Sequence, residues 1–220
     1  MRTVVFDLDG TLADTSADLI AAANTCFRAR GLGDLLDPVV DARTAFRGAR
    51  AMLTLGYSRG GTGGAEEIEA DYPRLLEVYG QALDVHSRLY PGARAAVERL
   101  GQAGYATAVC TNKPEEMASQ LLESLGVRGL FGAIVGADTL PVRKPDPAPL
   151  VASVERAGGD MARALLVGDT ETDRETARAA GVPCVLVTFG PDGRGVAALA
   201  PEALLDHFDE LDALVAGLVG

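Results

Sequence analysis

Short apolar runs alternate with longer amphipathic segments along most of this chain. The runs lie at residues 4–6, 105–110, 133–136, 164–168 and 182–188, and each ends at polar residues or glycine. Before or after the later runs, apolar residues recur at helical spacing over 92–101, 114–125, 147–157 and 171–180. Strands that alternate with helices of this length are typical of βαβ units. We therefore predict an α/β fold with an open, parallel, Rossmann-like sheet.

The region between the first two apolar runs has helical periodicity and no convincing strand. We predict helices over about 17–30 and 66–86. A further helix is predicted to begin at Asp37-Pro38, because Asp can cap a helix and Pro suits its first turn. A short apolar stretch at 51–55 and a glycine-rich break at 60–64 complete this region.

These patterns divide the chain into a core and an insert. We predict an α/β core domain formed by residues 1–15 and 87–220, interrupted by a helical domain at 16–86. Residues 202–218, at the end of the core, combine a short apolar run with an acidic amphipathic helix. A length of 220 residues suits one such domain with an insert.

Charge and composition exclude several classes of partner. The net charge of −11 argues against nucleic acid, whose phosphate backbone requires a basic surface. No run of about 18 apolar residues is present to span a membrane, and a strand begins too early to leave room for a signal peptide. The three cysteines are widely spaced in apolar surroundings, which fits buried thiols in a cytoplasmic protein.

The first strand ends in two carboxylates, Asp7 and Asp9. Residues i and i+2 of an extended strand point to the same side, so both groups can face one small target. Like charges this close disfavour each other's ionisation, and a hard cation such as Mg²⁺ would compensate them. An Asx turn at Asp9-Gly10 is an equally good explanation when this stretch is taken alone.

Other polar residues follow the later strands. In open α/β sheets ligands bind beyond the carboxyl ends of the strands. The residues found there are Thr111, Asn112, Asp169 and Asp173, with Lys144 in the loop after the third strand. Carboxylates, an ammonium and a hydroxyl near a helix start suit a phosphoryl group together with Mg²⁺.

Lysine is scarce in this chain. Lys113 and Lys144 are its two lysines, against eighteen arginines. A general preference for arginine accounts for most positions, and these two could be places where a compact ammonium is required.

Four stretches resemble the motifs of the haloacid dehalogenase-like hydrolase superfamily, in the order of that family. They are Asp7-Leu-Asp9-Gly-Thr11, Thr111-Asn112, Lys144-Pro145 and Gly168-Asp169 with Asp173. The helical insert resembles the C1-type cap of the same superfamily. Among its branches, the sequences around these motifs look most like those of phosphoglycolate phosphatases.

The resemblance implies a role for each motif residue. Asp7 would be the nucleophile that forms an aspartyl-phosphate, and Asp9 the acid–base. Mg²⁺ would be held by Asp7, by the backbone carbonyl of Asp9 and by Asp169, with Asp173 in support. Thr111 and the Asn112 amide would hold phosphoryl oxygens, and Lys144 would neutralise charge between Asp7 and the phosphate.

The resemblance also implies a function. We expect a Mg²⁺-dependent phosphomonoesterase that acts on a small phosphorylated metabolite, with 2-phosphoglycolate as the first candidate, in a monomer or homodimer. Arg47 and Gly48, in the stretch Phe46–Arg50, are expected to contact the substrate, and Arg50 is a second candidate there. The alternatives are a sugar-phosphate phosphatase or phosphomutase, a pyrophosphatase and, in another class, a phosphoacceptor signalling domain.

Overall fold

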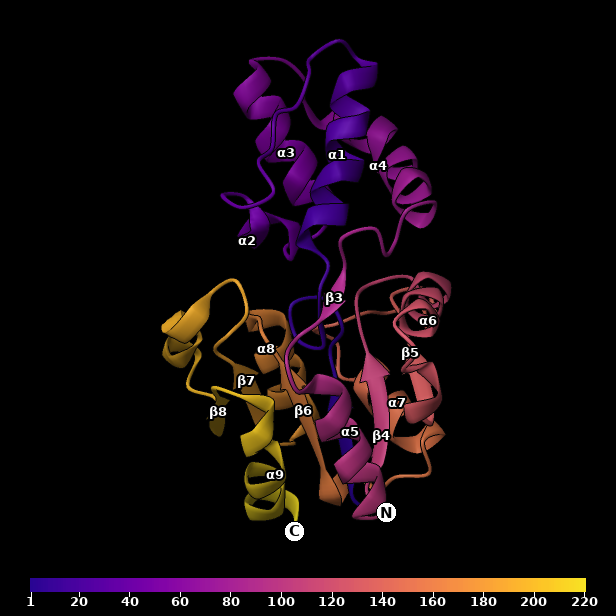
Figure 1. Ribbon diagram of the computed structural model, residues 1–220, viewed down its shortest axis with the longest axis vertical. Helices are drawn as coiled ribbons and strands as arrows, with labels where there is room; N and C mark the ends of the chain where they lie inside the picture. The colour runs from indigo at the N-terminus through magenta and orange to yellow at the C-terminus, as the bar shows by residue number, and fades with distance from the viewer. The chain divides into compact units, whose positions relative to one another are not determined.

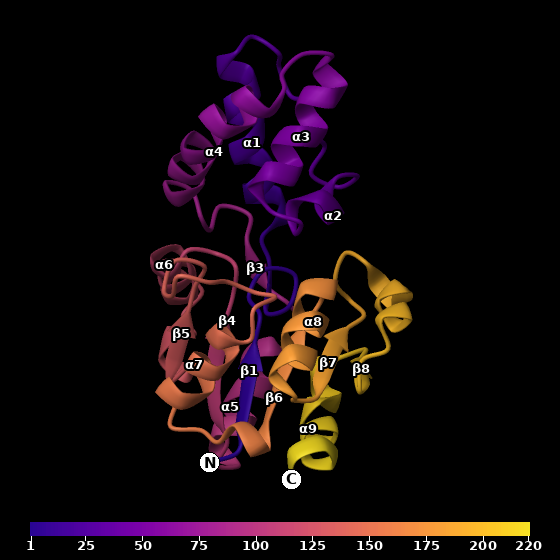
Figure 2. The same cartoon turned by 180° about the vertical axis from the view of Figure 1, so that it is seen from behind.

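The computed structural model describes residues 1–220. The chain divides into two compact units, Met1–Ala13 with Leu89–Gly220 and, between them in sequence, Asp14–Arg88. We call the first the core unit and the second the helical unit. Figures 1 and 2 show the elements of both units from two sides.

A parallel sheet of six strands forms the centre of the core unit, in the order β5-β4-β1-β6-β7-β8. Its strands are β1 (Thr3–Phe6), β4 (Ala106–Cys110), β5 (Ala133–Val135), β6 (Ala164–Gly168), β7 (Cys184–Val187) and β8 (Ala203–Leu205). The inner strands are buried along nearly their whole length, as strands covered on both faces must be. The predicted α/β class is confirmed.

Helices cover both faces of this sheet (Figures 1 and 2). The helices α5 (Ala93–Gln102) and α9 (Leu211–Val219) lie on one face, and α7 (Ala148–Arg156) and α8 (Glu171–Ala180) on the other. The helix α6 (Glu115–Ser124) packs beside β5. Short 3-10 turns complete the unit at Arg128–Leu130, Met161–Arg163, Gly193–Leu199 and Phe208–Glu210.

The strand β8 is absent from the predicted elements. Its three residues are too few to show a period of two, and only Leu205 is fully buried. The strand forms because the chain pairs there with β7: the Glu202 amide donates to the Cys184 carbonyl, and the Thr188 amide donates to the Leu205 carbonyl. Tertiary pairing thus creates an edge strand that the local pattern does not indicate.

Four helices make up the helical unit. They are α1 (Ser16–Ala29), α2 (Ala42–Ala45), α3 (Ala49–Gly60) and α4 (Ala65–Gly80). Their core includes the rings of Phe27 and Tyr57, which meet edge to face with centroids 5.2 Å apart. A two-stranded sheet pairs β2 (Ala13–Asp14) with β3 (Arg88–Leu89) where the chain passes between the units. No helix in the chain has the length and apolar character needed to cross a membrane.

The structure differs from the predicted helices in three details. Asp37-Pro38 starts a turn and no helix, because Oδ1 of Asp37 accepts the Val39 and Val40 amides and closes the chain on itself. The apolar stretch at 51–55 belongs to the longer helix α3. The helix α4 continues through Pro73 and ends at Gly80, six residues earlier than expected.

Two glycines in helices give opposite predictions for stability. A methyl group at Gly56 in α3 would overlap the buried Phe27 ring, whereas Gly101 in α5 has no neighbouring atom within 4 Å of that position. We expect Gly56→Ala to lower the free energy of unfolding by about 1–3 kcal/mol through overpacking. Gly101→Ala should raise it by about 0.5–1 kcal/mol through helix propensity. Urea unfolding followed by circular dichroism measures both, and equal changes of the same sign would contradict this packing.

Candidate active site

The candidate site lies at the carboxyl edge of the sheet, beyond the central strand β1. The Asp7 amide donates to the Val167 carbonyl of β6, which anchors the residue directly after β1. The Thr111 amide, directly after β4, likewise donates to the Val135 carbonyl of β5. Because β1 pairs in parallel with both β4 and β6, Asp7, Thr111 and Asp169 follow neighbouring strand ends.

Three carboxylates gather here into an acidic cluster formed by Asp7, Asp169 and Asp173. One oxygen from each lies within 4.8 Å of the others, and the three residues are 9%, 1% and 0% exposed. Oδ1 of Asp169 accepts a hydrogen bond from the Thr11 hydroxyl at 2.8 Å. Oδ2 of Asp169 is buried with no hydrogen-bond partner. A buried carboxylate oxygen without a donor is costly and indicates that a cation completes the site.

Lys144 bridges two members of the acidic cluster. Its Nζ lies 3.0 Å from Oδ2 of Asp7 and 2.6 Å from Oδ1 of Asp173, with a side chain 1% exposed. The other oxygen of Asp173 accepts from the Thr170 hydroxyl at 2.7 Å and from the Asp169 and Thr170 amides. Both Asp173 oxygens are therefore engaged. The same holds for Asp7, whose Oδ1 accepts the Leu8 amide at 2.7 Å and whose Oδ2 lies against Lys144, so Oδ2 of Asp169 is the oxygen of the acidic cluster that lacks a partner.

Burial sets the electrostatics of this cluster. It raises the pKa of Asp7 to about 6. Attraction to Lys144 lowers this pKa, and repulsion from Asp173 and Asp9 raises it further. Burial, and then repulsion from Asp173 and Asp7, also raises the pKa of Asp169 well above its usual value. Burial would do the same at Asp173, but attraction and hydrogen bonding to Lys144 lower the pKa of that carboxyl.

The residues present fit a hard divalent cation. All the side-chain ligand atoms that the acidic cluster offers are carboxylate oxygens, which Mg²⁺ and Ca²⁺ prefer. Gly10 contributes to the fit, since its φ of 85° favours glycine and a methyl group there would overlap Oδ2 of Asp169. The missing side chain lets the backbone at Gly10 approach this buried, unpartnered oxygen. Asp7 and Asp169 would hold the ion, and the Asp9 side chain lies outside the acidic cluster.

The phosphate-binding residues implied by the resemblance also lie at this edge. Thr111 is buried, and its hydroxyl accepts the Lys113 amide at 3.2 Å. Asn112 is exposed, and its side-chain amide donates to the Lys144 carbonyl at 3.1 Å. Asn112 thus ties the loop of Lys144 to the end of β4. The helix α6 begins at Glu115, whose amide donates to Oδ1 of Asp138 at 2.8 Å.

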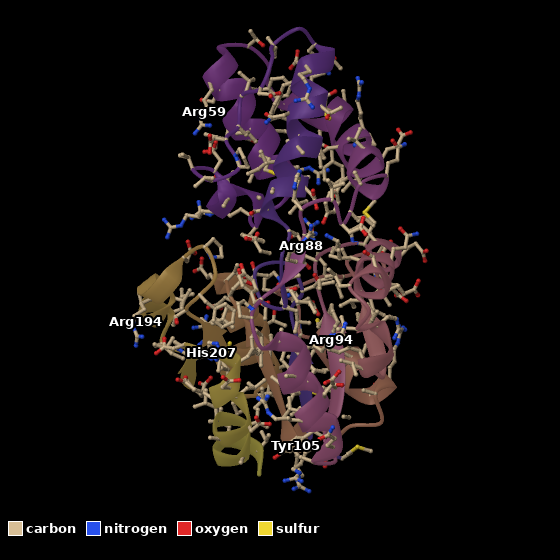
Figure 3. All side chains as sticks on the ribbon, in the orientation of Figure 1. Arg59, Arg88, Arg94, Tyr105, Arg194 and His207 are labelled. Carbon is tan, nitrogen blue, oxygen red and sulfur yellow. The ribbon has the colours of Figure 1, made fainter.

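One site residue has no role in the sequence-based interpretation. Nζ of Lys113 lies 3.0 and 3.3 Å from the two carboxylate oxygens of Asp9, and its side chain is 3% exposed. Two sequence signals pointed to this residue, the scarcity of lysine and its place directly after the motif Thr111-Asn112. His207 takes no part in the site: its Nδ1 accepts the Asp209 amide, and the residue lies at the surface (Figure 3).

The substrate-binding candidates Arg47 and Gly48 lie in the helical unit. The Arg47 side chain is exposed and forms no hydrogen bond or ion pair, and Gly48 precedes α3 with a φ of 94°. Arg50 is committed elsewhere: it forms a two-point ion pair with Glu69, and its guanidinium carbon lies 3.8 Å from the Tyr72 ring centroid. Arg47 is therefore the better candidate of the two arginines for binding an anion.

Comparison with known proteins identifies the family. The sequence profile of the haloacid dehalogenase-like hydrolase family matches residues 4–187. The chain belongs to this family. It is 41% identical over 215 residues to the phosphoglycolate phosphatase of Mesorhizobium japonicum, covering 94% of this chain and 92% of that protein. It is 40% identical over 210 residues to the phosphoglycolate phosphatase of Agrobacterium fabrum, covering 94% and 89%.

A solved structure supports the same assignment. The crystal structure of a predicted phosphoglycolate phosphatase from Haemophilus somnus superposes with a TM-score of 0.85 at 27% identity, over 97% of each chain. The resemblance noted in the four motifs is thus confirmed at the level of the family and of this branch. The chain is a hydrolase of the haloacid dehalogenase-like type.

The raised pKa values make a prediction about metal and pH. Between about pH 4 and pH 6 the folded protein without metal retains protons at Asp7 and Asp169 that the unfolded chain releases. The stability that these two carboxyls contribute in their protonated form is therefore lost as pH rises through this window. A divalent cation at this cluster would bind the ionised carboxylates, so a Mg²⁺ excess should raise the melting temperature by about 5 °C or more at pH 7.5 and by much less at pH 4.5.

Thermal melts in EDTA and in Mg²⁺ at the two pH values measure this effect. Asp169→Asn is the control, because it removes the unpartnered oxygen as an anionic ligand. A Mg²⁺ shift of equal size at both pH values, or one retained by Asp169→Asn, would contradict the assignment of the cation to the acidic cluster.

Proposed function

We propose that this protein is a Mg²⁺-dependent phosphomonoesterase that acts through an aspartyl-phosphate, with 2-phosphoglycolate as its substrate. The observation that carries the proposal is the environment of Asp7. This carboxylate lies beside the Lys144 ammonium and belongs to the acidic cluster, in which Oδ2 of Asp169 has no hydrogen-bond partner. Thr111 follows the adjacent strand β4. A nucleophile, a cation site and a phosphate-binding hydroxyl therefore meet at one strand edge.

The reaction has two displacements at phosphorus. In the first, a carboxylate oxygen of Asp7 forms a bond to phosphorus, the bond from phosphorus to the ester oxygen breaks, and Asp9 gives that oxygen a proton. In the second, water attacks the phosphorus of the aspartyl-phosphate, Asp9 accepts a proton from the water, and the bond between Asp7 and phosphorus breaks. Inorganic phosphate and the alcohol are the products.

The surrounding residues lower the electrostatic barrier to these steps. Lys144 lies against Asp7, so its positive charge can reduce the repulsion between this carboxylate and an incoming phosphate. The Thr111 hydroxyl and the Asn112 amide can hold phosphoryl oxygens. Mg²⁺ held by Asp7 and Asp169 would add positive charge at the same place.

The choice of 2-phosphoglycolate is supported by the relatives and by one residue of the helical unit. Proteins about 40% identical along most of the chain are phosphoglycolate phosphatases. A substrate that carries a carboxylate beside its phosphate requires a second cationic contact, and arginine binds a carboxylate in a two-point geometry. Arg47 has an exposed guanidinium without an intramolecular partner and is the residue we assign to this contact.

We expect Arg47→Met to raise KM for 2-phosphoglycolate by about 10-fold or more, since a hydrogen bond to a charged group contributes about 1.5–3 kcal/mol. It should leave KM for p-nitrophenyl phosphate, which has no carboxylate, within about twofold. Arg50→Met is the matched control, because its guanidinium is already held by Glu69 and Tyr72. Steady-state kinetics with both substrates measures these KM values. Equal effects of the two substitutions would contradict the assignment of Arg47 to the substrate carboxylate.

A phosphate-release screen over small phosphate esters, with and without Mg²⁺, tests the function as a whole. Preference for a sugar phosphate or pyrophosphate would favour the alternative activities of the family, and a stable phosphoprotein without turnover would favour a signalling role. We also propose a cytoplasmic location and a monomer or homodimer. The three free, buried cysteines are compatible with a reducing compartment.

A further inference from the structure

Each of the two lysines of the chain forms an ion pair with a different aspartate of the first motif, Asp7 or Asp9. Lys144 pairs with Asp7 and Asp173, and Lys113 pairs with both carboxylate oxygens of Asp9. Both ammonium groups are buried in the same strand edge of a protein that otherwise uses arginine. A compact ammonium in each place keeps the two carboxylates in separate ion pairs.

The backbone of Lys113 is fixed from two sides. Its amide donates to the Thr111 hydroxyl at 3.2 Å, and its carbonyl accepts the Ala137 amide, after β5, at 3.0 Å. Gly136 makes this approach possible, since a methyl group there would lie 2.7 Å from the Lys113 carbonyl oxygen. The side chain therefore extends from a rigid position, and its 3% exposure leaves it little freedom.

The pairing also determines where the Asp9 carboxylate lies. Asp9 follows Asp7 by two residues, and four carboxylates in one pocket would repel one another. The acidic cluster contains Asp7, Asp169 and Asp173 and excludes the Asp9 side chain. Lys113 offers Asp9 a cationic partner on the side of β4, next to Thr111.

We propose that Lys113 is a positioning residue that holds the Asp9 carboxylate outside the acidic cluster, beside the path of the ester oxygen and the attacking water. This inference rests on the proposed function and deepens it. Lys113 itself contacts neither the substrate nor the cation. It acts through Asp9, so its removal should affect the steps that use Asp9 and spare the attack by Asp7.

The substrates separate these steps. The alcohol of 2-phosphoglycolate must be protonated as it leaves, whereas p-nitrophenolate leaves without a proton. Hydrolysis of the aspartyl-phosphate requires Asp9 with either substrate. Loss of Asp9 positioning should therefore give a burst of about one equivalent of p-nitrophenolate per enzyme, followed by slow turnover.

The experiment is a double-mutant cycle of Lys113→Met and Asp9→Asn, with pre-steady-state and steady-state kinetics in Mg²⁺. General acid–base catalysis contributes about 10²- to 10⁴-fold, so we expect Asp9→Asn to lose turnover in that range. Lys113→Met should lose about 10- to 100-fold in kcat with KM within about threefold, and should show the burst. The double variant should be no more than about threefold slower than Asp9→Asn alone.

Two controls separate positioning from other effects. Arg178→Met, which breaks an exposed ion pair with Glu175 on α8, changes the net charge equally and should show wild-type kinetics. The rise in melting temperature caused by Mg²⁺ should persist in Lys113→Met, because the acidic cluster is intact. If Lys113→Met does not fold, Lys113→Gln enters the same cycle under the same criteria.

Losses that multiply in the double variant, or an unchanged kcat in Lys113→Met, would overturn the proposal. A raised KM with no burst would do so as well, because it would mean that Lys113 acts directly on the phosphate. Failure of the proposed function looks different: the wild-type protein with Mg²⁺ would then release phosphate from neither substrate. That result would overturn both inferences before any variant is compared.

Discussion

Asp7→Asn is expected to reduce phosphate release by at least about 10⁴-fold, because the amide cannot form the acyl-phosphate bond on which turnover depends. The change is nearly isosteric and leaves the strand end in place. Asp7 directly follows β1, and its Oδ2 lies 3.0 Å from the Lys144 ammonium. Measured kcat with 2-phosphoglycolate and with p-nitrophenyl phosphate should fall together.

The same variant should gain stability when metal is absent. Burial raises the pKa of Asp7 to about 6, so at pH 7.5 the folded protein holds this carboxylate in its disfavoured ionised form. An amide removes that cost together with the repulsion from Asp173. Asp7→Asn in EDTA should therefore melt above the wild-type protein at pH 7.5. A variant that loses activity and also melts lower would indicate damage to the fold and would weaken the assignment of Asp7 as the nucleophile.

Lys144→Met is expected to lower both activity and stability. Its ammonium lies within 3.0 Å of Asp7 and 2.6 Å of Asp173, and the side chain is 1% exposed. Removing one partner of a buried ion pair costs about 3–5 kcal/mol, because the other charge is left buried and unpaired. Turnover should fall by at least about 10³-fold, as expected when a preorganised charge beside the nucleophile is lost.

A second substitution separates the two effects of Lys144→Met. Lys144→Met leaves two buried carboxylates, Asp7 and Asp173, without their cation. Adding Asp173→Asn removes one of these two charges, so the double variant should recover part of the lost free energy of unfolding. It should recover little activity, because the positive charge beside Asp7 is still missing. Urea unfolding and phosphate release measure the two quantities. Recovery of activity together with stability would mean that Lys144 has only a structural role.

The helix and strand pattern identified most of the core because each element satisfies local rules. The inner strands are continuous apolar runs, and helices α7 and α8 begin near Pro147 and Thr170, where a proline and a capping residue stand. The failures lie where local signals are weak. The strand β8 has three residues, and α3 has two glycines and little amphipathic pattern, so contacts made elsewhere in the fold decide both.

The sequence by itself determined which chemistry is available and at which edge of the sheet. Parallel strands all end at one edge, so Asp7, Thr111 and Asp169 had to meet there once the strands were recognised. The family follows from the same residues.

Only the tertiary structure decided how these groups are paired. Lys113 reaches Asp9 across 104 residues of sequence, and the Thr11 hydroxyl reaches Asp169 across 158. The tertiary structure also pairs Lys144 with Asp7 and Asp173, and it leaves Oδ2 of Asp169 without a hydrogen-bond donor. Local periodicity carries no information about such long-range ion pairs, because they depend on which buried charges the completed sheet brings within a few ångströms.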